Sequence, residues 1–128
     1  GATAMFDGFP VSARLPAADL ERARAWYEQK LGLKPSNEDM GGLWYQTGGS
    51  WFLVYRTEFA GTAKNTAAGW SVKGIEALVA DLRARGVVFE EYEIPGAQLV
   101  DGLLTMGPFK AAWFKDSEGN ILEISQVP

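Results

Sequence analysis

The sequence predicts an α+β protein built from two β-α-β-β-β modules, each with a mixed sheet and one helix. A strand that leads directly into an amphipathic helix occurs near the N-terminus and again about 55 residues later, and a hairpin follows in each half with an offset of about 70 residues. Each module has a helix on only one face of its sheet. We therefore expect two bare sheet faces that enclose a cavity.

The first module is expected over residues 6–60. Residues 11–15 alternate as a short strand, and Asp19 can cap the helix that follows. The helical stripe consists of Leu20, Ala23, Tyr27 and Leu31. Gly32 supplies the left-handed residue that ends a helix.

The rest of this module reads as β-structure. Residues 34–40 are polar and predict at most a short edge strand. Residues 43–46 and 51–56 form a hairpin, because Gly48 and Gly49 suit a tight turn between them. A loop over residues 59–66 then separates the two halves.

The second module is expected over residues 66–127. Residues 67–73 alternate as a strand, and a helical stripe that ends at Gly86 follows at Ile75, Leu78, Val79 and Leu82. Residues 87–93 predict a strand with acids on its outer face. Residues 95–107 are rich in Pro and Gly, and we expect a mobile connection there.

A β-hairpin over residues 113–126 closes the chain. The Asp, Ser, Gly and Asn residues of 116–120 suit a reversal. In the outgoing strand Leu122 and Ile124 share one face, so Ile121, Glu123 and Ser125 share the other. Glu123 is then either an ordinary surface acid or part of a cavity wall.

Composition excludes several classes of function. The 128 residues fit one domain over 1–128, and a net charge of −4 without a block of Lys and Arg argues against nucleic-acid binding. The absence of Cys and His leaves only oxygen ligands and carboxylate, Lys or Tyr chemistry. No apolar segment is long enough for a membrane and no leader is visible, so we expect a cytoplasmic protein. Met5 is a candidate natural start, with residues 1–4 not native.

Three segments carry a resemblance to a known family. They are Ala-Asp-Leu-Glu-Arg-Ala-Arg-Ala-Trp-Tyr at 18–27 with Leu-Gly-Leu at 31–33, Leu-Arg-Ala-Arg-Gly-Val at 82–87, and Trp-Phe-Lys-Asp-Ser-Glu-Gly-Asn-Ile-Leu-Glu at 113–123. In this order and spacing the chain resembles the vicinal oxygen chelate superfamily of glyoxalase I, extradiol dioxygenases, and fosfomycin- and bleomycin-resistance proteins. The resemblance implies paired modules around a cavity, and a homodimer in which modules of two chains assemble.

In metal-dependent members of that superfamily, a cation is held by one residue from each first strand and one from each last strand. The resemblance places these positions at Ser12, Leu53, Ala67 and Glu123. Only Glu123 is a good ligand, and a transition metal needs three or four. We therefore predict that the protein holds no metal and no other cofactor.

Strand parity around these positions proposes the cavity lining, which comprises Ser12, Arg14, Trp44, Trp51, Leu53, Tyr55, Ala67, Gly69, Ser71, Phe114, Ile121, Glu123 and Ser125. Ring faces stack on planar groups and attract cations, so this cavity suits an aromatic or cationic ligand. Glu123 would orient a donor or cationic group of the ligand, and Arg14 an acceptor. The alternative is that the rings of Trp44, Trp51 and Phe114 are simply core.

For the other candidate catalytic residues, the sequence favours structural or solvated roles. Asp116 and Glu118 could form an acid-base pair, but their place in a polar turn favours a solvated, turn-forming role. Tyr27 has the spacing of a core residue. Lys73, at a strand end, is expected to be solvated rather than catalytic.

The sequence thus favours a metal-free small-molecule-binding protein of the bleomycin-resistance type, which sequesters an aromatic or drug-like ligand and contributes to antibiotic resistance without catalytic residues. The first alternative is a metal-dependent lyase, isomerase or dioxygenase that uses Glu123 as its base. The second alternative is an interaction or regulatory domain with a filled cavity.

Overall fold

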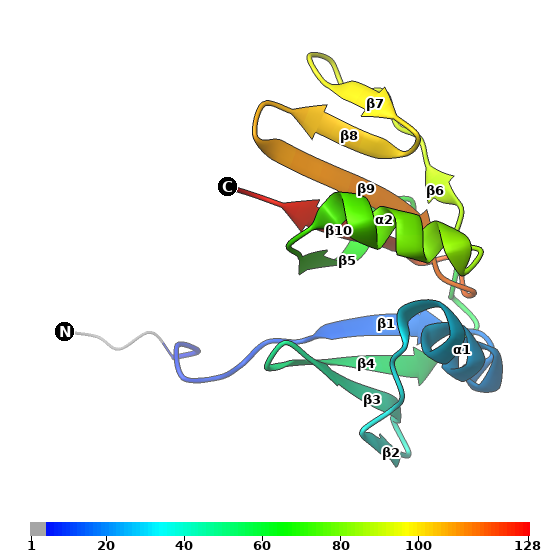
Figure 1. Ribbon diagram of the computed structural model, residues 1–128. Helices are drawn as coiled ribbons and strands as arrows, with labels where there is room; N and C mark the ends of the chain where they lie inside the picture. The colour runs from blue at the N-terminus through cyan, green and yellow to red at the C-terminus, as the bar shows by residue number, and fades with distance from the viewer. Residues whose placement is uncertain (1–4) are drawn as a thin grey trace.

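The computed structural model describes residues 5–128, so the suggestion about residues 1–4 lies outside the described residues. Figure 1 shows two halves, one above the other. The first half contains β1 (Ala13–Ala17), α1 (Leu20–Trp26), the π-helical turn η1 (Tyr27–Leu31), β2 (Asn37–Asp39), β3 (Gly42–Thr47) and β4 (Ser50–Arg56). The second half contains β5 (Thr66–Ser71), α2 (Ile75–Ala84), β6 (Phe89–Glu90), β7 (Gln98–Val100), β8 (Leu103–Met106), β9 (Phe109–Lys115) and β10 (Ile121–Gln126).

Each half forms its own mixed sheet. The first sheet has the order β1-β4-β3-β2, and the second has the order β5-β10-β9-β8-β7, with β6 beside β9. In both sheets the first and last strands of the half are parallel neighbours, and the other pairs are antiparallel. The predicted α+β class and the repeated strand-helix plan are therefore confirmed.

The predicted signals at the first helix are confirmed. The Asp19 carboxylate accepts a hydrogen bond from the backbone N–H of Arg22 at 3.0 Å, and Gly32 ends the helical segment with φ 69°. The strand before the helix runs to Ala17, beyond the predicted end at residue 15. Pro16 is tolerated there because β1 is an edge strand of its sheet.

The prediction of a mobile connection over residues 95–107 was wrong. This segment folds as the β7–β8 hairpin, in which Gln98 pairs with Thr105. Its turn contains Asp101 and Gly102, with φ 53° and 82°. An Asp-Gly pair between apolar residues is a strong hairpin signal, which the surrounding Pro and Gly residues obscured. The strand predicted over 87–93 shortens to β6.

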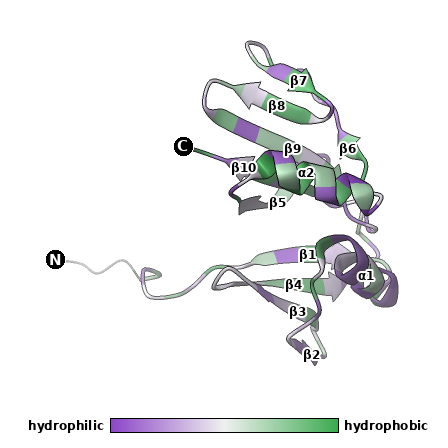
Figure 2. Ribbon diagram, in the orientation of Figure 1, coloured by the Kyte–Doolittle hydropathy of each residue, from purple (hydrophilic) through white to green (hydrophobic). Residues whose placement is uncertain are grey.

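Both helices lie on the same side of the paired sheets, and one core lies beneath them (Figure 1). In Figure 2, α1 is coloured mostly hydrophilic toward the viewer, as expected for a helix whose apolar stripe faces a sheet. Aromatic rings cross the boundary between modules. Phe52 meets Trp70 edge to face at 5.9 Å, and Trp26 stacks on Phe114 at 6.2 Å. No helix within residues 5–128 is long and apolar enough to span a membrane.

The turn between β9 and β10 joins the two modules through Glu118. Its side chain is fully buried, and its carboxylate accepts hydrogen bonds from the backbone N–H groups of Ala18 and Asp19 at 2.9 and 3.0 Å. The Arg22 guanidinium also donates to both carboxylate oxygens, at 2.8 and 2.9 Å. The expectation of a solvated Glu118 was therefore wrong, because this turn docks on the start of α1 instead of facing water.

Asp116 is likewise buried, contrary to expectation. Its carboxylate accepts a hydrogen bond from the Tyr27 hydroxyl at 2.7 Å and two from the backbone N–H groups of Glu118 and Asn120 at 2.8 and 2.9 Å. The Asn120 amide also donates to the carbonyl of Pro16 at 2.9 Å. Burial and the Asp116 carboxylate raise the pKa of Tyr27 well above its usual value, so the phenol remains a donor. Tyr27 is a core residue, as predicted.

The first prediction concerns the stability of this junction. Replacing Glu118 by Ala removes the acceptor for two backbone N–H groups at the start of α1, and we expect the free energy of unfolding to fall by about 1–3 kcal/mol. Urea denaturation followed by circular dichroism measures this loss. Glu91→Ala is the control, since Glu91 is exposed and should change stability little. Equal stability of the Glu118→Ala variant and the control would contradict the role of Glu118.

The junction should also make stability depend on pH. Burial alone would raise the pKa of Glu118, but hydrogen bonds from Arg22, Ser117 and the Asp19 backbone lower it from 4.5 to about 2. The ionised carboxylate therefore contributes stability above about pH 4.5, and this contribution is lost as pH falls from about 4.5 toward 2.

We expect the difference in unfolding free energy between the wild type and Glu118→Gln to shrink across that window. Denaturant titrations at several pH values measure it, and the other carboxylates cancel because both proteins share them. A difference that stays constant, or grows toward acid, would contradict this assignment.

Candidate functional site

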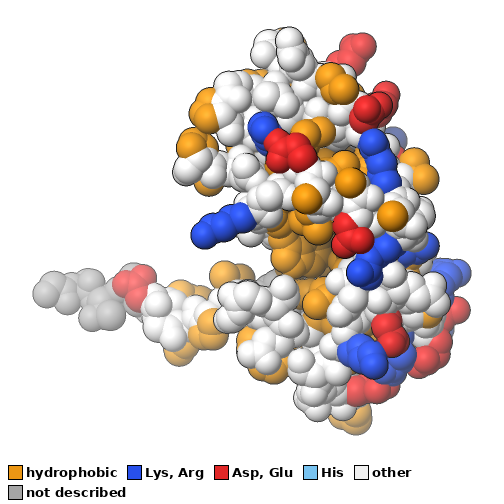
Figure 3. Space-filling view, in the orientation of Figure 1, with side chains coloured by type: hydrophobic (Ala, Val, Ile, Leu, Met, Phe, Trp, Pro, Cys, Tyr) orange, Lys and Arg blue, Asp and Glu red, His pale blue; other side chains and the backbone are white. Residues whose placement is uncertain are grey.

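A cleft of about 730 Å³ opens between the two modules, and the helical segments η1 and α2 form part of its wall. In Figure 3 it is the recess lined by hydrophobic side chains between the upper and lower halves. Residues from β4, β5, β9, β10, η1 and α2, and from the segment that follows η1, form its walls. They include Leu31, Leu33, Trp51, Phe52, Ala68, Trp70, Leu78, Leu82, Phe114 and Ile124.

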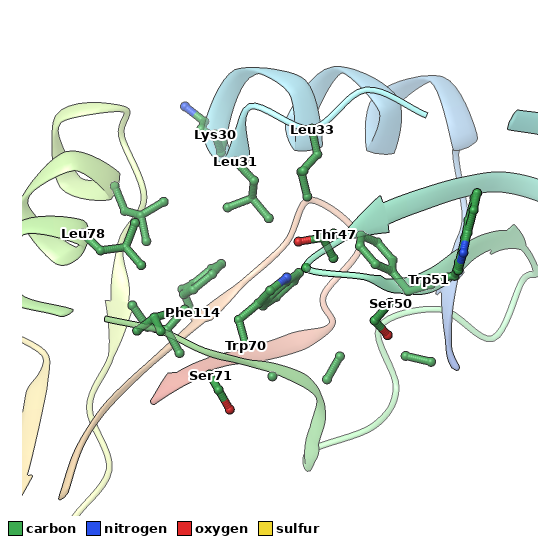
Figure 4. A pocket seen from close by; sticks show the side chains of 18 of the residues that line it. Lys30, Leu31, Leu33, Thr47, Ser50, Trp51, Trp70, Ser71, Leu78 and Phe114 are labelled. Carbon is green, nitrogen blue, oxygen red and sulfur yellow. The ribbon is translucent and has the colours of Figure 1, made fainter. Parts of the chain in front are cut away.

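The cleft exists because the modules meet without a shared ladder. Within the described residues, β1 and β5 are edges of separate sheets and no hydrogen-bonded ladder joins them. Side chains of β4 and β5 near this boundary therefore line the seam where the sheets part. Figure 4 shows Trp70 and Phe114 below, with Leu31 and Leu33 above them.

The π-helical turn η1 shapes one wall of the cleft. The Leu33 N–H donates to the carbonyl of Tyr27 at 3.0 Å, so the chain closes a wide turn around Gly32. This turn places Lys30 and Leu31 at the cleft. Such π-helical insertions are frequent at functional sites.

The two helix ends are linked across the cleft by basic side chains. The Lys30 ammonium donates to the carbonyl of Arg85 at 2.5 Å, and the Arg85 guanidinium donates to the carbonyl of Gln29 at 3.5 Å. Asp81 lies 3.5 Å from the Arg85 guanidinium. Each cation thus lies at the C-terminal end of the other module's helical segment, where the helix dipole favours positive charge. We call the Lys30 and Arg85 pair the latch.

The cleft differs in position from the cavity that the sequence predicted. Of the residues predicted to line the cavity, it contains Ser12, Trp51, Gly69, Ser71 and Phe114. It does not contain Arg14, Trp44, Leu53, Tyr55, Ala67, Ile121, Glu123 or Ser125. The predicted cavity lay between bare sheet faces, whereas residues of both parities line this cleft. Trp70 and Phe114 lie on the helix-covered side, while Gly69 and Ser71 alternate with Trp70 along β5.

Phe114 reaches the cleft from a face that was not expected. The β9–β10 register pairs Phe114 with Leu122 and Trp113 with Glu123. Paired residues share a face, so Phe114 points toward the helices and Trp113 points away from them. The predicted placement of Phe114 beside Glu123 was therefore wrong.

The far face of the second sheet is not bare, which corrects another expectation. Trp113 packs edge to face against Tyr92 at 5.6 Å. A small second core covers this face and contains Leu104, Ala111, Trp113 and Ile121, with Ala97, Leu99 and Phe109 packed around it. The segment before β7 and the β7–β8 hairpin supply part of this cover, and the sequence had predicted a mobile connection there.

The far face of the first sheet carries a surface stack. The Arg14 guanidinium lies over the Trp44 ring at 4.9 Å, and the Trp44 indole donates to Asp39 at 3.0 Å. Leu53, which pairs with Trp44, is buried on this face, and Tyr55 is half-buried. Strand parity placed these residues on the same face correctly.

The residues at the four positions that hold the cation in metal-dependent members of the superfamily do not fit a transition metal here. Leu53 and Ala67 have no side-chain donor, and Ser12 offers only a hydroxyl. Glu123 is half-buried and pairs with Gly69, so its carboxylate lies beside backbone. Among residues 5–128, no three His, Cys, Asp or Glu side chains come together as a metal cluster.

Several cleft residues escaped the sequence analysis. The cleft is also lined by Leu31, Leu33, Trp70 and Leu78. The sequence analysis placed Leu31 and Leu78 in helical stripes, and it gave Leu33 and Trp70 no role in ligand binding. One signal could have found the latch, since Arg85 stands directly before Gly86 and Lys30 stands two residues before Gly32, the glycines that follow the two helices. Lys73, in contrast, is exposed as expected.

Comparisons with known proteins identify the family. The sequence profile of the Glyoxalase/Bleomycin resistance protein/Dioxygenase superfamily matches residues 10–124. No match is found among curated proteins.

Three solved structures illustrate the likeness. A glyoxalase family protein from Enterococcus faecalis is 19% identical, covers 94% of this chain and 99% of its own, and has a TM-score of 0.69. A glyoxalase/bleomycin resistance protein from Catenulispora acidiphila is 20% identical, with coverage of 92% and 97% and a TM-score of 0.64. The fosfomycin resistance protein FosX from Listeria monocytogenes, complexed with Mn(II) and sulfate, is 10% identical, with coverage of 94% and 91% and a TM-score of 0.70. Because the profile spans most of the chain and these structures share its fold, the chain belongs to the Glyoxalase/Bleomycin resistance protein/Dioxygenase superfamily.

Proposed function

We propose that this protein binds and sequesters a small aromatic molecule in the cleft between its modules. The observation that carries the proposal is the cleft itself, whose volume of about 730 Å³ and largely apolar walls are typical of small-molecule sites. Trp51 is 42% exposed and Trp70 is half-buried, so both rings can still gain contacts from a ligand.

Binding without a reaction fits the chemistry of the lining. Asp81 is the one carboxylate among the residues that line the cleft, and it is exposed beside Arg85. The lining contains aromatic rings, small hydroxyl side chains and two cations, which can hold and orient a ligand but supply no paired acid and base. A role in resistance follows from this proposal, since a protein that holds a drug-like molecule lowers its free concentration. FosX, one of the structural neighbours, is a fosfomycin resistance protein.

A homodimer is part of the same proposal. Four large apolar side chains near the N-terminus are exposed in the single chain, namely Met5, Phe6, Phe9 and Val11. Apolar side chains gathered in this way are typical of association surfaces.

The binding prediction uses N-phenyl-1-naphthylamine, a neutral aromatic fluorophore. We expect saturable binding with quenching of tryptophan emission, and Trp70→Leu should weaken the affinity about two- to tenfold because one ring contact is lost. Trp44→Leu is the matched control, since Trp44 lies on the far face outside the cleft. Urea denaturation of each variant separates lost affinity from lost stability. No binding by the wild type, or weakening by Trp44→Leu alone, would contradict the proposal.

The competing function is a metal-dependent enzyme that uses Glu123, the only strong ligand among the four family positions. On our proposal, protein purified without chelators carries well below one equivalent of Mn, Fe, Ni or Zn, because those positions lack donors. Elemental analysis measures the content, and EDTA treatment should leave the affinity for N-phenyl-1-naphthylamine unchanged. One equivalent of metal that disappears in Glu123→Gln would favour the enzyme instead.

A further inference from the structure

The charged side chains at the cleft are not balanced. The residues that line it include two cations, Lys30 and Arg85, and one carboxylate, Asp81. The local sum is therefore +1, although the whole chain has a net charge of −4. A positive end on an apolar cleft in an acidic protein favours a ligand that carries negative charge.

The latch leaves hydrogen-bond donors free. The Lys30 ammonium has three donors and uses one on the Arg85 carbonyl. The Arg85 guanidinium has five donors, and its contacts with Gln29 and Asp81 are both long, at 3.5 Å. A ligand oxygen at this end can therefore be bound by both cations without breaking a strong contact. Hydrogen bonds of this kind are about twice as strong as those between neutral groups.

The position of the cations relative to the rings adds a requirement on the ligand. Figure 4 shows Lys30 above Leu31 with its nitrogen at the rim, directed away from Trp70 and Phe114 on the opposite wall. Lys30 is half-buried, so part of its charge lies away from bulk water and is less screened than that of a surface lysine. A ligand that satisfies both regions has a flat apolar body and one acidic group.

We propose that the cleft binds aromatic anions, with the ring system between the modules and the carboxylate, sulfonate or phosphate group on Lys30 and Arg85. This inference rests on the proposed function and names its ligand class. The competing explanation is that the latch only holds the two helix ends together. That explanation predicts no preference between charged and neutral forms of one ligand.

The experiment compares two fluorophores with the same ring skeleton. 8-Anilinonaphthalene-1-sulfonate is N-phenyl-1-naphthylamine with an added sulfonate. The two molecules differ only in this anionic group, so a difference between their affinities reports its contribution. We expect the wild type to bind the sulfonate more tightly. Lys30→Gln and Arg85→Gln should each weaken sulfonate binding about three- to tenfold, the value for a partly exposed charge-assisted contact, and should change amine binding less than about twofold.

Two further variants complete the design. Lys34→Gln is the matched control, because Lys34 is an exposed cation outside the cleft that pairs with Glu28 at 3.6 Å. Lys30→Arg keeps the positive charge and should retain sulfonate binding, even if its hydrogen bond to the Arg85 carbonyl changes. Near-ultraviolet circular dichroism confirms that each variant remains folded, since this sulfonate also binds partly unfolded proteins.

The outcomes separate the two proposals. Equal affinity of the wild type for both fluorophores overturns the anion inference and leaves cleft binding intact. A sulfonate preference that survives in Lys30→Gln and Arg85→Gln, or falls equally in Lys34→Gln, also overturns it. Binding of neither fluorophore overturns the proposed function itself.

Discussion

The buried carboxylate of Glu118 is the constraint on which the arrangement of the modules depends. The two sheets share no ladder within the described residues, so other contacts must fix their relative position. Glu118 belongs to the second module, yet it binds backbone and side-chain donors at the start of α1 in the first. A buried carboxylate without partners would be costly, whereas five donors compensate this one, including the Ser117 hydroxyl at 2.7 Å. The modules therefore cannot separate at this point without exposing or orphaning the charge.

The same junction explains why the cleft opens where it does. Gly119 in the turn approaches Gly61 so closely that a Cβ on Gly119 would lie 2.8 Å from the Gly61 Cα. The segment between modules, the turn and the end of β1 are therefore packed tightly together. Ser12, just before β1, lines the cleft at the opposite end of that strand. The modules are thus joined at one end of the seam and parted at the other, and the latch spans the gap between their helices.

Local sequence signals predicted most of the fold, but they could not choose between the two faces of the sheets. Asp19, Gly32 and Gly48 act on the backbone around them, so their effects are visible in the sequence. Phe114 lies in an apolar run without alternation, and its face is set by the register with β10. The cover on the far face of the second sheet comes from residues 92–99, which are distant in sequence from Trp113. Contacts of that range leave no periodic pattern, so the sequence could not show that this face is covered.

The loss of metal ligands is compatible with this fold because the metal positions are not what holds it together. Leu53 is 8% exposed and needs no polar partner, and Ala67 adds no group that must be satisfied. In proteins whose folding depends on a bound ion, removal of ligands also removes stability. Here the aromatic contacts between modules and the Glu118 junction supply the connection instead. The four positions can therefore diverge in chemistry while the modules stay paired. The seam between them is lined by aromatic and aliphatic side chains, with Lys30 and Arg85 also in its lining.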